Sequence, residues 1–62
     1  MYTNYYIEQG KRYKEASEEL KKASRAYWTR VHAENVKTGR EDLIIFSGQI
    51  LSQYDLVDAG EV

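Results

Sequence analysis

The chain is expected to turn within the segment TGREDLIIF, residues 38–46. This stretch separates two segments in which apolar residues recur with helical period, a long one over about residues 4–37 and a shorter one over about residues 41–57. Residues 58–62 follow as a short acidic tail that we expect to be frayed. The sequence therefore predicts one all-α domain spanning residues 1–62, a helical hairpin with a long first helix and a shorter second helix.

The turn of this hairpin has two local explanations. Thr38 and Glu41 have the spacing of a capping box, which begins a helix directly ahead of an apolar run. Gly39 could instead take a left-handed conformation and close the first helix. Both interpretations place the turn at about residues 38–40.

A strand over residues 43–51 competes with the second helix, because isoleucine and phenylalanine favour strands. The chain offers no obvious second strand to pair with it. We therefore favour the helix.

Large side chains recur every seven residues along the first segment, with small ones between them, as on the seam of a coiled coil. The large residues are Tyr6, Tyr13, Leu20 and Tyr27, and the small ones are Ala16 and Ala23. The second segment presents Leu43, Phe46 and Ile50 on one face. All of these residues are the expected oligomer interface, and those from Leu20 onward, with Val31, are also expected to form the core of the hairpin.

Two features predict self-association. At about 1.5 Å per residue the first helix is roughly 50 Å long and the second under about 30 Å, so the N-terminal part of the first lacks a partner in its own chain. A 62-residue chain without cysteine also buries too little apolar surface in a two-helix hairpin to offset its conformational entropy. We expect a homo-oligomeric helical bundle, either a dimer or a higher oligomer.

No arrangement of residues indicates catalysis. The single histidine, His32, lies on the polar side of the first helix, without a nucleophile at a catalytic spacing. One histidine without cysteine does not make a structural zinc site, and no glycine-rich phosphate loop is present. We expect a protein that is not an enzyme and that needs no cofactor or metal.

Trp28 is the main candidate for recognition. Its heptad phase places it off the seam, and tryptophan anchors dominate many interfaces. The alternative is that the second helix or another subunit covers it. Tyrosines ahead of the seam combine an apolar body with a hydroxyl, which suits a contact surface. The candidate partner-binding residues are Trp28, Arg25, His32, Tyr2 and Tyr5.

The charges are unevenly distributed although the net charge is only −1. All nine lysines and arginines lie within residues 11–40, and no basic residue follows Asp42. A basic stripe on the first helix raises nucleic-acid binding as an alternative function, since phosphates attract such surfaces. Its members are Lys11, Lys14, Lys21, Lys22 and Arg25. Because glutamates interrupt it, a solvated helix face is the simpler interpretation.

In size and layout the chain resembles the repressor-of-primer proteins of small plasmids, helical hairpins that dimerise into four-helix bundles. The unequal helices, and a seam with alanine only in the first, depart from that family, so its RNA-binding role is not carried over. The chain is also similar to the small helical accessory proteins from the early region of lambdoid phages. That resemblance implies a role in redirecting host or phage regulation by binding another protein, in the host cytoplasm.

We therefore expect a small regulator or adaptor that acts by protein–protein interaction, with itself and with another protein as partners. A nucleic-acid-binding regulator that uses the basic face of a helical dimer is the alternative. The longest uninterrupted apolar run, residues 43–46, is too short to cross a bilayer. We expect a cytoplasmic protein without contact with a membrane.

Overall fold

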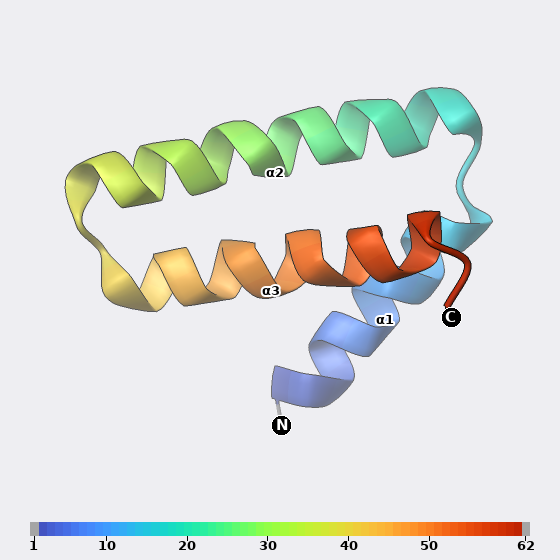
Figure 1. The fold of residues 1–62 in the computed structure, drawn as a ribbon, viewed down its shortest axis with the longest axis horizontal. Coiled ribbons are helices and arrows are strands. Elements are labelled where there is room, and N and C mark those ends of the chain that lie inside the picture. Colours follow the sequence, from blue (N-terminus) through green and yellow to red (C-terminus); the bar gives the residue numbers. More distant parts are fainter. Residues whose placement is uncertain (1, 62) are drawn as a thin grey trace.

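The computed structural model describes residues 2–61, and residues 2 and 3 by their backbone alone. These residues form three helices and no strand (Figure 1), namely α1 (Tyr2–Glu15), α2 (Glu18–Thr38) and α3 (Glu41–Asp58). The prediction of an all-α fold is confirmed. The prediction of two helices is wrong, because the segment expected to form one long helix is divided into α1 and α2.

Ser17 explains the break between α1 and α2. Its backbone is extended, and its hydroxyl accepts a hydrogen bond of 3.2 Å from the backbone N–H of Leu20. Glu18 and Glu19 follow in the first turn, where negative charge is favourable beside the N-terminus of a helix. The chain therefore has a local reason to start a new helix here, although the heptad seam continues through the break.

Gly39 makes the turn between α2 and α3. Its φ of 73° lies in the left-handed region. The N–H groups of Gly39 and Arg40 donate to the carbonyls of Val36 and Asn35, each at 3.2 Å, which is the Schellman arrangement. Thr38 is the last residue of α2 and does not cap α3, whose N-cap residue is Arg40. Of the two predicted explanations for the turn, the structure has the one based on Gly39.

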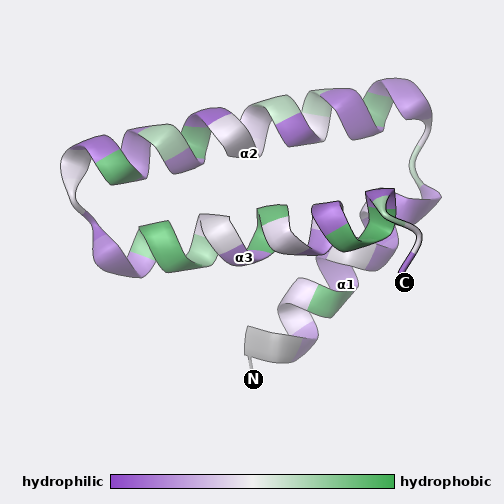
Figure 2. Ribbon diagram, viewed as in Figure 1, coloured by the Kyte–Doolittle hydropathy of each residue, from purple (hydrophilic) through white to green (hydrophobic). Residues whose placement is uncertain are grey.

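α3 is the element that both other helices pack against. In Figure 1, α2 and α3 run side by side in opposite directions, while α1 crosses α3 at an angle from its other side. Figure 2 shows green, apolar residues along much of α3 and more purple, polar residues along α2. The molecule measures 32 × 27 × 15 Å along its principal axes, so it is a flat three-helix unit.

The core lies where α1 crosses α3. Its buried apolar residues are Tyr13, Ile50 and Tyr54. Partly buried residues pack around them, and these are Tyr6, Trp28, Phe46, Leu51 and Val57. The N-terminal segment, which the sequence analysis leaves for another subunit to cover, is therefore covered by α3 of its own chain.

Residues 59–61, which belong to the predicted frayed tail, form backbone hydrogen bonds with the last turns of α3; residue 62 lies outside the described residues. Gly60 has φ 77°, and its N–H donates to the carbonyl of Val57 at 3.0 Å. The N–H of Glu61 donates to the carbonyl of Leu56 at 2.9 Å, so α3 also closes with the Schellman arrangement. Within residues 2–61, each helix falls short of the length or the apolar character needed to cross a bilayer.

Candidate functional site

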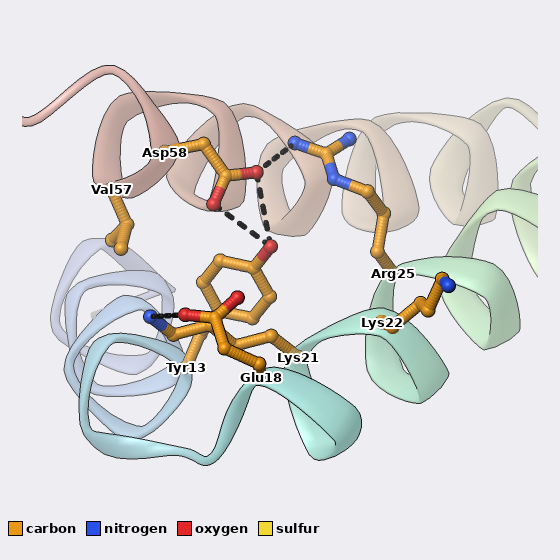
Figure 3. A pocket seen from close by; sticks show the side chains of 7 residues that line it. All are labelled: Tyr13, Glu18, Lys21, Lys22, Arg25, Val57 and Asp58. Atoms are coloured by element: carbon orange, nitrogen blue, oxygen red, sulfur yellow. Dashed lines mark hydrogen bonds and ion pairs between the residues drawn. The ribbon is translucent and has the colours of Figure 1, made fainter.

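A stacked pair of tyrosines joins α1 to α3. The ring centroids of Tyr13 and Tyr54 lie 4.0 Å apart, with 11° between the ring planes. The hydroxyl of Tyr13 donates to the carboxylate of Asp58, with 3.0 Å to each oxygen (Figure 3). Burial, with Tyr13 nearby, raises the pKa of the Tyr54 phenol. This pair ties the first helix to the last.

Arg25 of α2 also binds the carboxylate of Asp58. Its Nη2 donates to Asp58 Oδ2 at 2.9 Å and also to the carboxylate of Asp55. These bonds raise the pKa of the Arg25 guanidinium, and the bond from Arg25 is the main reason that the pKa of Asp58 is lowered. Asp58 therefore accepts from both α1 and α2, and one carboxylate links all three helices.

An open hollow of about 620 Å³ lies over this cluster. Its lining residues, labelled in Figure 3, are Tyr13, Glu18, Lys21, Lys22, Arg25, Val57 and Asp58. Positive and negative groups are mixed here, since Lys21 Nζ lies 3.6 Å from Glu18 Oε1 and Arg25 binds Asp58. Three cationic and two anionic side chains line the hollow, and two of the cations, Lys21 and Arg25, lie beside carboxylates. These side chains therefore act mainly to hold the three helices together.

A second polar cluster joins α2 to α3 near the turn. Ser47 is fully buried, and its hydroxyl lies 2.7 Å from Nδ1 of His32. Nδ2 of Asn35 donates to the Ser47 hydroxyl at 3.2 Å and to the carbonyl of Leu43 at 3.1 Å. Ser47 also lies 2.9 Å from the carbonyl of Leu43, which its hydroxyl can reach as a donor.

This serine–histidine pair has the distance of a nucleophile and its base, but not the access. Ser47 is 0% exposed, so an electrophile could not approach its oxygen without separating α2 from α3. The hydrogen bond between His32 and Ser47 therefore holds α2 and α3 together. Sequence reasoning missed Ser47 and Asn35. The available signal was that His32 and Asn35 lie one turn apart on α2, with the small pair Ser47–Gly48 on α3.

Aromatic rings form a continuous path across the three helices. Trp28 packs edge-on against Phe46, with centroids 5.8 Å apart, and against Tyr27 at 5.3 Å. On the α1 side, Phe46 contacts Tyr5 at 5.6 Å and Tyr6 at 5.9 Å. Trp28 therefore packs beside the core, which is the alternative stated for it, and its position needs no external partner.

An apolar hollow lies at one end of this path. We call it the Phe46 hollow. It has a volume of about 360 Å³, and its lining residues are Tyr6, Asp42, Leu43, Ile45 and Phe46. Ile45 at its edge is 62% exposed, the largest exposure among the large apolar residues of the described chain. Tyr5, which stacks on Phe46, is 42% exposed.

The predicted seam is divided between two environments. Tyr6 and Tyr13 pack against α3 of the same chain, where Leu43, Phe46 and Ile50 are also partly or fully buried. Ala16 lies in the link after α1. By contrast, Leu20 and Tyr27 are 55% and 56% exposed, and Ala23 between them is exposed as well. The prediction that Leu20, Ala23 and Tyr27 form the core of a hairpin is therefore wrong.

The other predicted partner residues are scattered. Arg25 is held by two carboxylates, and His32 is half-buried beside Ser47, so neither flanks an exposed Trp28. Tyr5 stacks on Phe46, one of the residues that line the Phe46 hollow. The side chain of Tyr2 lies outside the described residues.

The predicted basic stripe is also divided. Lys21 and Arg25 lie beside carboxylates, as described above, and Lys21 Nζ sits 5.9 Å from the centroid of the Tyr13 ring. Lys11, Lys14 and Lys22 are exposed. Lys11 and Lys14 border a second hollow of about 360 Å³ between α1 and α3, together with Ile7, Gly10 and Gln53.

Comparison of the chain with known proteins finds no matching family model, no matching curated protein and no matching solved structure. Among residues 2–61 no group of three or more histidines and carboxylates is placed to hold a metal ion. The candidate site therefore rests on geometry, and it is the Phe46 hollow, where Ile45 is 62% exposed.

Proposed function

We propose that the protein is a small, non-catalytic protein-interaction module that binds another protein at the Phe46 hollow. The observation that carries this proposal is Ile45, which is 62% exposed at the edge of a hollow lined by Phe46 and Leu43. An exposed apolar side chain beside an apolar hollow is typical of an interaction surface. An aliphatic or aromatic side chain of the partner would fill the hollow and cover Ile45.

The charges around the hollow favour a basic partner segment. Asp42 lines the hollow with a side chain that is 75% exposed, and Glu41 precedes it in the same helical turn. Arg40 Nε lies 3.9 Å from Asp42, and such an exposed, distant pair neutralises the carboxylate only weakly. The preferred partner segment therefore carries one apolar anchor and a lysine or arginine that can reach Asp42.

Site-specific photo-crosslinking tests this proposal. A photoreactive phenylalanine analogue at position 45 should crosslink a second protein species in cells, whereas the same group at Ser52, two turns further along α3 and exposed, should not. The crosslink at position 45 should be lost when Phe46→Ala empties the floor of the hollow. Equal crosslinking at positions 45 and 52, or none at position 45, would contradict the proposal.

A role in redirecting host or phage regulation follows from the stated resemblance to phage accessory proteins, and it stays a prediction. The Phe46 hollow supports this role only to the extent that it offers a binding surface. Mass spectrometry of the crosslinked species would identify the partner, and with it the process.

A further inference from the structure

The outer face of α2, which we define as Leu20, Ala23 and Tyr27, is apolar and uncovered. These residues lie at i, i+3 and i+7, so they share one side of the helix. Leu20 and Tyr27 are each more than half exposed. α2 contacts α3 through a different side, which includes Trp28 and Asn35. The outer face thus lies on a different side of α2 from Arg25, Trp28 and His32, whose side chains contact α3.

The fold gives this face a reason to be covered. α2 contributes no fully buried residue, and among the side chains that the structure describes the buried apolar core consists of Tyr13, Ile50 and Tyr54. A domain of this size buries too small a fraction of its surface to be more than marginally stable alone. Burial of Leu20 and Tyr27 would add apolar area without rearranging the three helices.

Two charges beside this face specify what can cover it. Glu19 and Arg30 lie eleven positions apart, close to three helical turns, so both border the same side of the outer face. Neither forms an ion pair within the part of the chain that the structure describes. In an antiparallel pair of helices, the residues on one flank of the first helix face the same flank of the second.

The pair Ala23–Tyr27 and the pair Glu19–Arg30 specify the same register to within half a residue. The midpoint between Glu19 and Arg30 falls at position 24.5, and the midpoint between Ala23 and Tyr27 falls at position 25. A two-fold axis through this point places Tyr27 of each copy over the small Ala23 of the other. The same axis places Glu19 of each copy beside Arg30 of the other, twice in the pair.

We infer that a second copy of this chain covers the outer face of α2, in an antiparallel α2–α2 dimer centred near residue 25. A parallel pair would set Tyr27 against Tyr27 and leave a gap between the alanines. It would also hold Glu19 and Arg30 about 16 Å apart along the helices, so that they could not pair. The dimer uses neither α1 nor the Phe46 hollow, so it is independent of the proposed function.

The contact is short, extending over about three turns of α2, and it falls at the small end of protein interfaces. A contact of this size is typical of a weak, reversible association. We expect a dissociation constant on the order of 10 μM, and sedimentation tests this value. The protein is therefore expected to exchange between monomer and dimer as its concentration changes.

Charge reversal in sedimentation velocity tests this dimer. Glu19→Arg alone and Arg30→Glu alone should each raise the dissociation constant by at least about tenfold, because each turns two attractive contacts into repulsive ones. An equimolar mixture of the two variants should form heterodimers of wild-type affinity. The chain carrying both substitutions should dimerise as the wild type does.

Thr29→Arg is the matched control, since Thr29 is exposed on the opposite side of α2 and its substitution should leave the dimer unchanged. Circular dichroism of every variant verifies that the helices remain. A wild-type chain that stays monomeric at concentrations a hundredfold above the expected constant would overturn the inference. So would a dimer that neither single reversal weakens, or a mixture of the two variants that fails to associate. Crosslinking from position 45 is unaffected in any of these cases, so the two proposals fail separately.

Discussion

Tyr13 and Tyr54 stack with their ring centroids 4.0 Å apart, and this contact holds α1 against α3. Tyr13 belongs to α1 and Tyr54 to the last turns of α3, so the stack closes the chain upon itself. The hydroxyl of Tyr13 then reaches Asp58, which also binds Arg25 of α2. The N-terminal tyrosines are thereby used within one chain, and the surface left for partners lies elsewhere.

Replacement of Tyr13 should separate the two roles of its side chain. Tyr13→Ala removes a ring that is 6% exposed and should lower the free energy of unfolding by about 3–5 kcal/mol. Tyr13→Phe keeps the stack and loses the hydrogen bond to Asp58, so this variant should lower the free energy of unfolding by about 0.5–1.5 kcal/mol. Urea denaturation measures both.

Tyr27→Ala is the control for this pair, because Tyr27 is 56% exposed. At concentrations where the chain is monomeric, this variant should unfold within about 1 kcal/mol of the wild type. Similar losses for Tyr13→Ala and Tyr27→Ala would mean that α1 does not pack on α3 in solution.

Ser17→Ala tests the break between α1 and α2 by the sign of its effect. Because Ser17 caps α2, the alanine variant should lose about 1 kcal/mol of unfolding free energy, and Ser17→Asp should stay close to the wild type. In a continuous helix the same position would be interior, and alanine would be the better residue. A rise in the melting temperature of Ser17→Ala would therefore support one long helix and contradict the three-helix fold.

Ser47→Ala should destabilise the contact between α2 and α3. It removes the group beside His32 Nδ1 and one of the two acceptors of Asn35, which leaves polar atoms poorly satisfied in a buried place. The expected loss is about 1–3 kcal/mol of unfolding free energy. Ser52→Ala, at an exposed position of the same helix, should change it by less than about 0.5 kcal/mol. Equal effects of the two substitutions would mean that the hydrogen bonds of Ser47 with His32 and Asn35 do not stabilise the contact between α2 and α3.

Acid should weaken the fold through Asp58. The bond from Arg25 lowers the pKa of this carboxyl below its ordinary value of 3.8 in the folded state. Its contribution is therefore complete above pH 3.8 and is lost as the pH falls through the lower, folded value. Melting temperatures between pH 7 and pH 2 should fall less steeply for Asp58→Asn than for the wild type. Glu61→Gln, which removes an exposed carboxyl beyond α3, should follow the wild-type curve, and identical curves for Asp58→Asn would contradict the prediction.

The sequence predicts the parts of this fold that depend on neighbours in the chain. Gly39 marks the second break because a left-handed residue is needed there, and glycine accepts that conformation most easily. Ser17 followed by two glutamates is a comparable local signal at the first break. The heptad repeat from Tyr6 to Tyr27 conceals this signal at Ser17, because large residues continue to recur every seven positions across the helix break.

The contacts that build the site are not local, and the sequence does not predict them. Tyr13 meets Tyr54 and Asp58, and His32 meets Ser47, only because α1 and α2 both pack against α3. Periodicity shows which side chains share a face of a helix, but not which helix that face meets. The periodicity predicts a subunit interface for the first half of the seam and the core of the hairpin for the second half, whereas the first half contacts α3 of its own chain and the second half remains exposed.

An isotope-filtered NOE experiment on a mixture of labelled and unlabelled chains distinguishes contacts within a chain from contacts between chains, and so tests whether α1 packs on α3 of its own chain. The account predicts that the Tyr13–Tyr54 contact appears only within one chain and is absent from the filtered spectrum. The contact between the Ala23 methyl and the Tyr27 ring should appear in the filtered spectrum at concentrations where the chain dimerises. A Tyr13–Tyr54 contact between chains would contradict the account, since it would mean that α1 leaves its own chain and packs on the α3 of a neighbour.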